Sequence, residues 1–127
     1  MPITLTSIPI QKNVLIRSYG NGGFRIGEST VSGSVYISGQ SVLPWAISQP
    51  EAISLEIFST EFLKETRSKI LIVGCGAKFS VPPANLRHSL KAQGIVLEWM
   101  TTGAGCRTFN VLLTENRPVS AALMAVE

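Results

Sequence analysis

One ten-residue stretch, from Thr101 to Asn110, gathers the side chains best suited to chemistry. It follows an apolar strand-like run and opens an apolar helix-like run, so we expect a strand-to-helix junction there. Unpaired backbone N–H groups at a helix start attract anions and favour the thiolate form of a cysteine. The junction therefore predicts a binding site, with the candidate residues Thr101, Thr102, Gly103, Cys106, Arg107, Thr108 and Asn110.

The thiol and the guanidinium of this junction each allow a functional and a structural interpretation. Cys106 could take part in ligand binding or redox chemistry, but cysteine is also among the most buried residue types. A covalent role would need a general base, and the single histidine, His88, falls on an exposed helix face. Arg107 could bind a carboxylate or phosphate through its forked guanidinium, or clamp neighbouring carbonyl groups or Glu98. Asn110, on the same helix face as Arg107, would cap a loop or complete a polar pocket.

Two further segments carry candidate site residues. Gly74, Cys75 and Gly76 end an apolar run, at the carboxyl end of a strand where ligands of open α/β sheets gather. A lone Gly-x-Gly is weak evidence for such a site, and a tight chain reversal is the better explanation. Arg25 lies in a glycine-rich hairpin whose edge is a candidate partner-binding surface. The sequence leaves open whether the two cysteines, Cys75 and Cys106, lie close together.

The elements that must position these residues change character along the chain. A β-rich part, residues 1–50, precedes an alternating α/β part, residues 51–127. We expect strands over 14–19, 24–26, 31–37, 69–73, 95–99 and 119–126, and helices from Ser54, from Pro82-Pro83 to Gly94, and over 102–114. Such alternation places helices against a central, partly parallel sheet, with antiparallel hairpins at its edge or in a second layer.

Composition narrows the classes of function. The 127 residues, 45% apolar and 15% charged, suit a single folded domain over 1–127. The chain has no Asp and one His, so we expect no metal site and no cofactor. The net charge of +3 makes nucleic acid an unfavoured partner, and the basic residues between Lys64 and Lys91 are expected to form a solvated face. We expect no signal peptide or membrane span and a cytoplasmic location, with self-association or peripheral attachment to a membrane complex left open.

Several of these segments together resemble one family. They are the run Ile70-Leu-Ile-Val-Gly-Cys-Gly76, a helix carrying Leu86 and Leu90, the segment Gly94 to Glu98, the junction Thr102 to Asn110, the hairpin Tyr19 to Gly27, and the pair Pro44-Trp45. From about residue 13 onward, the chain resembles the Mth938-like domains, family 498 of the domains of unknown function.

The resemblance implies a three-layer α/β fold with a mixed central sheet. For the mitochondrial relative it implies a role in assembling NADH:ubiquinone oxidoreductase through protein contacts. It supplies no catalytic residues, and this chain has Thr101 and Cys75 where many relatives have Asp and Thr. We therefore expect a non-enzymatic protein-interaction module that assists a respiratory or other multiprotein complex. The alternative is a domain that binds a small anionic ligand, with thiol redox chemistry at Cys106.

Overall fold

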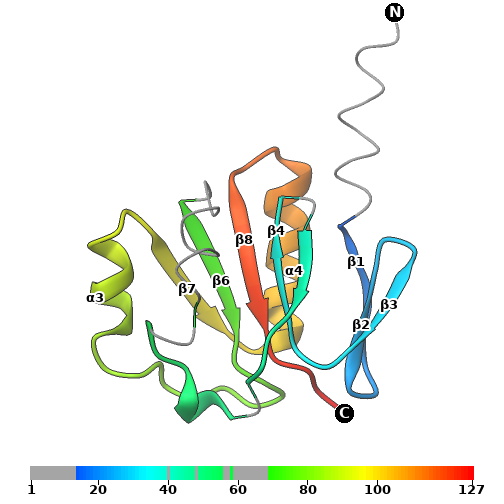
Figure 1. Cartoon of the computed structure of the whole chain (residues 1–127). Coiled ribbons are helices and arrows are strands. Elements are labelled where there is room, and N and C mark those ends of the chain that lie inside the picture. Colours follow the sequence, from blue (N-terminus) through cyan, green and yellow to red (C-terminus); the bar gives the residue numbers. More distant parts are fainter. Residues whose placement is uncertain (1–13, 40, 48, 56–57, 59–68) are drawn as a thin grey trace, which may run out of the picture.

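The computed structural model describes residues 14–39, 41–47, 49–55, 58 and 69–127 of the chain (Figure 1). The amino-terminal part supplies strands β1 (Ile16–Gly20), β2 (Gly23–Ile26), β3 (Ser29–Ser32), β4 (Val35–Ser38) and β5 (Ser41–Pro44), and the short 3-10 helix η1 (Pro50–Ala52). The remainder supplies β6 (Ile70–Gly74), α3 (Leu86–Lys91), β7 (Val96–Met100), α4 (Thr102–Thr114) and β8 (Val119–Leu123).

The described strands form two sheets. In the larger one the order is β5-β4-β8-β6-β7; β6 runs parallel to both β7 and β8, while β4 and β5 are antiparallel to their neighbours. The smaller sheet, β1-β2-β3, is antiparallel throughout. Helix α4 and the smaller sheet pack on one face of the larger sheet, and α3 packs on the other. These layers confirm the predicted α/β class with a mixed central sheet and antiparallel hairpins.

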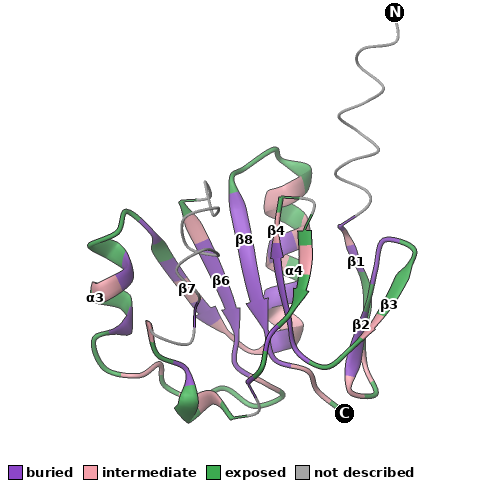
Figure 2. Cartoon of the chain, viewed as in Figure 1, coloured by how far each residue is buried: buried purple, intermediate pink, exposed green. Residues whose placement is uncertain are grey.

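Strand β6 shows why the core has two halves. Leu71 and Val73 face the side of α3, Ile72 faces the side of α4, and all three are fully buried. Successive side chains of a strand point to opposite faces, so a strand covered on both faces must be apolar throughout. Figure 2 shows the same burial along β6 and β8. The strand predicted over 69–73 is confirmed, with observed bounds Ile70–Gly74.

The single strand predicted over residues 31–37 is wrong, because the chain turns in its middle. Gly33 adopts a φ of +85°, which separates β3 in the small sheet from β4 in the large one. The buried hydroxyl of Ser34 fixes this turn: it donates to the carbonyl of Ile47 (3.3 Å) and accepts from the N–H of Ala125 (2.9 Å). One alternating segment thus crosses from one sheet to the other.

Two other predicted boundaries change. Helix α3 begins at Leu86 and not at Pro82-Pro83, because Asn85 adopts a left-handed φ of +70°. Its predicted inward residues, Leu86 and Leu90, are buried, and the last strand ends at Leu123 and not at residue 126. The predicted helix over 102–114 has the observed bounds of α4. The helix expected from Ser54 onward falls mostly outside the described residues.

Glycines allow α4 to approach the sheet closely. A Cβ on Gly74 would lie 2.9 Å from both the Cα of Thr102 and the Cδ2 of Leu123. One on Gly105 would lie 3.1 Å from the same Leu123 methyl group and 3.7 Å from the Cα of Gly74. The two glycines therefore face each other across the contact between helix and strand.

We expect Gly74→Ala to lower the free energy of unfolding by about 1–3 kcal/mol, because its methyl group meets backbone that cannot move alone. Gly105→Ala serves as the comparison: its methyl group meets a side chain that can shift, and Ala is favoured over Gly in a helix by about 1 kcal/mol. Urea unfolding of both variants, followed by circular dichroism, checks this order. Equal losses, or an unchanged midpoint for Gly74→Ala, would contradict it.

Candidate functional site

The carboxyl ends of β6, β7 and β8 meet at one edge of the larger sheet, as their parallel pairing requires. There the Cys75 N–H donates to the Met100 carbonyl (2.8 Å) and the Met124 N–H donates to the Gly74 carbonyl (3.0 Å). The loop Gly74–Gly76 and the start of α4 are therefore neighbours. Both predicted segments, Gly74–Gly76 and the junction that begins at Thr101, follow the carboxyl ends of parallel strands.

Thr102 joins these chain ends with its side chain. It is fully buried; its hydroxyl donates to the Met124 carbonyl (2.8 Å) and accepts from the Gly76 N–H (3.0 Å). Its own N–H donates to the carbonyl of Gly76 (2.9 Å). These bonds use the one proton of the hydroxyl, so Thr102 has no donor left for a ligand.

The first turn of α4 satisfies most of its N–H groups internally. The Thr101 hydroxyl caps the helix by accepting from the Ala104 N–H (3.4 Å), and the Gly105 N–H donates to the Thr101 carbonyl (2.8 Å). An anion at a helix start binds through free N–H groups. Since the N–H groups of Thr102 and Ala104 already have partners, this helix start offers few donors to an anion.

Asn110 fastens the small sheet to α4. Its Nδ2 donates to the carbonyl of Ile16 (2.8 Å), and its Oδ1 accepts from the N–H of Ile16 (2.9 Å). The register of β1 against β2 shifts between Ile16 and Ser18, an irregularity that takes the chain out of the regular ladder. The amide of Asn110 therefore serves β1 as a strand partner would.

Tyr19 is a contact that the sequence analysis missed. Its phenol group lies directly against Gly103, where any Cβ would collide with the phenol oxygen. The Arg107 guanidinium lies beside the same position. Tyr19 is 42% exposed and Arg107 is exposed. Tyr19 and Arg107 are therefore accessible side chains beside the start of α4.

The two cysteines lie on opposite faces of the larger sheet. Cys106 packs with Ile72 and Phe109, whereas Cys75 packs on the side of α3 with Trp99. Burial raises the pKa of the Cys106 thiol from 9.0 to about 12, against the opposing effect of the Arg107 charge. Desolvation of the thiol thus has a larger effect on its pKa than the groups that favour the thiolate. This supports the interpretation of Cys106 as a buried packing residue.

The other candidate residues do not converge on one point. Arg25 is exposed between the buried Phe24 and Ile26, so it lies on the face of the small sheet that points away from α4. No ion pair joins Arg107 to Glu98, both of which the structure describes. In the described part of the chain, no group of three or more His, Cys, Asp or Glu side chains is placed to hold a metal ion.

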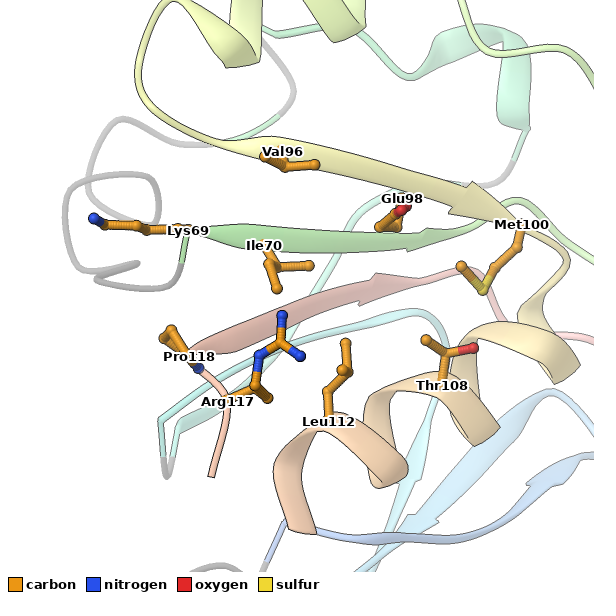
Figure 3. Close-up of a pocket in the computed structure, with 9 residues that line it drawn as sticks. All are labelled: Lys69, Ile70, Val96, Glu98, Met100, Thr108, Leu112, Arg117 and Pro118. Carbon is orange, nitrogen blue, oxygen red and sulfur yellow. The ribbon is translucent and has the colours of Figure 1, made fainter. Parts of the chain in front are cut away.

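A pocket of about 650 Å³ lies between α4 and the edge of the larger sheet (Figure 3). Its lining is mostly apolar and comes from β6, β7, α4 and the turn after α4: Lys69, Ile70, Val96, Glu98, Met100, Thr108, Leu112, Arg117 and Pro118. Only Thr108 among these residues was predicted as a site residue. The side chains of Val96, Glu98 and Met100 share one face of β7, but the sequence does not show that β7 is an edge strand.

Comparison with solved structures defines the type of domain. A Bordetella pertussis structure described as an Mth938-like domain shares the fold, with a TM-score of 0.72 at 23% identity over 90% of this chain and 86% of that one. A Bartonella henselae structure described as an outer membrane protein has a TM-score of 0.81 at 35% identity, covering 91% of this chain and 97% of that one. The chain therefore has the α/β fold of a Mth938-like domain. None of its described helices is long and apolar enough to cross a membrane.

The chain belongs to the family described as a protein of unknown function (DUF498/DUF598), which matches residues 16–124. It is 34% identical over 110 residues to the Danio rerio NADH dehydrogenase [ubiquinone] 1 alpha subcomplex assembly factor 3. That match covers 87% of this chain but only 63% of the zebrafish protein, so the chain spans less than two thirds of that relative. It is also 25% identical to a 13 kDa major membrane protein of Francisella tularensis, over 96% of this chain and 99% of that protein.

We expect Asn110→Ala to destabilise the fold by about 1–3 kcal/mol, because it removes both hydrogen bonds to Ile16 and leaves two backbone groups without partners. Asn110→Asp keeps the acceptor for the Ile16 N–H but places a carboxylate oxygen against the Ile16 carbonyl, so at neutral pH its loss should be at least as large. Hydrogen exchange at the Ile16 amide provides the local measurement. Unchanged exchange at that amide in Asn110→Ala would show that the clamp does not hold β1.

The Cys106 thiol should make stability decrease in alkaline solution. Its folded pKa, about 12, lies above the ordinary value of 9.0, so the folded state keeps a proton that the unfolded chain loses. Stability is therefore complete below about pH 9 and decreases as pH rises toward about 12, by at most about 1.4 kcal/mol per pH unit. Cys106→Val has no thiol to titrate. The free energy of unfolding of wild type, measured with urea, should therefore decrease relative to that of Cys106→Val between about pH 8 and about pH 10.5. A constant difference between the two proteins would contradict the buried thiol.

Proposed function

We propose that this chain is a protein-interaction module that assists the assembly of a respiratory complex, without catalysing a reaction. The observation that carries the proposal is its similarity to curated assembly factors of NADH dehydrogenase. The similarity to the Danio rerio protein extends over 87% of the chain, and a human relative of the same description is 30% identical over 96% of it. The shared part is the folded domain itself, so a function that resides in this domain can be common to both.

The internal bonding of the predicted junction supports a role without catalysis. The side chains of Thr102 and Asn110 form hydrogen bonds with backbone groups of the protein, and the Cys106 thiol is buried with a raised pKa. A nucleophile needs a base within hydrogen-bond reach, and His88 lies exposed on α3, on the opposite side of the larger sheet from Cys106. The accessible side chains near this junction, Tyr19 and Arg107, lie on the protein surface, where they could contact another protein.

The same bonds count against the alternative of a small anionic ligand at this junction. Such a ligand would use the N–H groups at the start of α4, and those of Thr102 and Ala104 already have partners. A thiol redox role at Cys106 would need a reactive thiolate, which burial disfavours. Arg107 is exposed and has no ion-pair partner among the described residues, so its charge is the feature of this junction that still favours an anion.

Attachment to a membrane complex from its surface accords with the relatives' descriptions. Two similar proteins are described as membrane proteins, although no described helix of this chain is able to span a bilayer. A domain that binds a membrane-embedded complex would be recovered with membranes in the same way. The partner in this proposal is therefore a subunit or intermediate of that complex.

Deleting the gene in its native cell should lower the amount of assembled NADH:ubiquinone oxidoreductase, because an assembly factor acts before the complex is complete. Native gel electrophoresis of membranes measures the complex, and NADH oxidation with ubiquinone as acceptor measures its activity. Succinate oxidation by the same membranes is the control, and re-expression of the chain should restore both readouts. Equal amounts of assembled complex with and without the gene would refute the proposal.

A further inference from the structure

The pocket beside α4 exists because the helix covers only part of the larger sheet. Helix α4 packs mainly on β6 and β8, and β7 lies at the edge of the sheet, where β6 is its one partner among the described strands. The face of β7 that points toward α4 is therefore uncovered among the described residues, and Val96 is 55% exposed there. Ile70, Met100 and Leu112 are half-buried around it. The result is an apolar groove with β7 as its floor.

Two opposite charges, Arg117 and Glu98, line this groove. The turn after α4 fixes Arg117: Asn116 adopts a φ of +60°, and the Arg117 N–H donates to the Leu112 carbonyl (2.9 Å). Figure 3 shows the guanidinium pointing toward Ile70, while Glu98 lies nearer Met100. In the described part of the chain neither Arg117 nor Glu98 forms an ion pair. The groove therefore has a positive end and a negative end.

The free edge of β7 is partly blocked. The Val96 N–H donates to the Lys69 carbonyl and the Met100 carbonyl accepts from Cys75, so the even-numbered residues of β7 direct their backbone groups toward β6 and its loop. Leu97 therefore directs its carbonyl outward, where the Arg87 guanidinium of α3 donates to it (2.5 Å). An occupied edge resists the addition of another strand. A partner would thus enter the groove with side chains and not as an added strand of the sheet.

We propose that the groove between α4 and β7 binds an apolar segment of the partner protein that carries an acidic residue at the Arg117 end and a basic residue at the Glu98 end. The inference rests on the proposed function and adds the docking site and the chemistry of the partner. Aliphatic side chains would cover Val96 and Leu112, and the two flanking charges would meet Arg117 and Glu98. Complementary charges set the direction of the segment, because the reverse direction brings like charges together.

The shape of the groove argues against a second copy of the chain as occupant. A two-fold contact would place Arg117 opposite Glu98 of the other copy, which suits the charges. The surface is hollow in both copies, however, and two hollows face to face enclose a void that leaves side chains without contacts. A protruding segment fills the groove and also reaches both charges.

Photo-crosslinking in the native cell tests this inference with a matched control. Val96 and Val111 are both 55% exposed, but Val96 lies in the groove and Val111 on the outer face of α4. We expect a benzophenone amino acid at position 96 to give a protein adduct that the same group at position 111 does not give. Mass spectrometry of the adduct should find a segment with apolar residues between an acidic and a basic one.

Charge reversal supplies the second measurement. Arg117→Glu should lower the adduct yield at position 96 at least about fivefold, since like charges at a docked contact are strongly unfavourable. Lys91→Glu changes the net charge by the same amount at an exposed position of α3, away from the groove, and should leave the adduct yield unchanged. Equal adducts at positions 96 and 111, an adduct with a second copy, a crosslinked segment without this pattern, or no effect of Arg117→Glu would each overturn the inference.

Complementation of the deletion separates this inference from the proposed function. Val96→Asp should fail to restore the assembled complex and Val111→Asp should restore it, provided that both unfold at the same urea concentration as wild type. If deletion lowers the complex and Val96→Asp restores it fully, the groove is not the docking site, although the assembly role stands. If deletion has no effect on the complex, the assembly role itself is wrong.

Discussion

The hydroxyl of Thr102 lies where β6, β7 and β8 end, fully out of contact with water, and connects the Gly76 N–H to the Met124 carbonyl. Each of these backbone groups would cost about 1–3 kcal/mol if it were buried without a partner. The same residue begins α4, so the hydrogen bonds that close the sheet edge also fix where the helix starts. The position of every later residue of α4, from Gly105 on the sheet to Asn110 on β1, follows from that anchor.

The start of α4 has to be made of small residues because it touches the sheet and the hairpin at once. Gly105 approaches Gly74 on one side, and Gly103 accommodates the ring of Tyr19 on the other. The same composition is expected where backbone must approach a ligand, so small residues at a strand-to-helix junction do not distinguish the two cases. Hydrogen bonds distinguish them: at this junction the polar groups are turned toward the protein's own backbone.

Local sequence patterns predicted those elements that depend on residues close together in the chain. The continuous apolar run of β6 and the helix over 102–114 were predictable from local sequence alone. The position of Gly74 and Thr102 at one edge of the sheet follows from the parallel pairing of β6 and β7. The division at Gly33 was missed because both halves of the segment look like one strand, and only the two sheets show that they separate. The partners of Asn110 and Tyr19 lie more than 80 residues away along the chain, so no local signal names them.

The groove follows from the sheet order, which is why no motif announces it. With β7 at the edge of the described sheet, α4 packs on β6 and β8, and no other described element covers the near face of β7. An exposed valine on that face gains nothing for an isolated domain, since a polar residue there would be better hydrated. Among the described residues the Arg117 guanidinium has no ion-pair partner, and it contributes nothing to the sheet edge and helix start, which Thr102 already closes. Both features are explained if another protein covers Val96 with apolar side chains and places an acidic residue against Arg117.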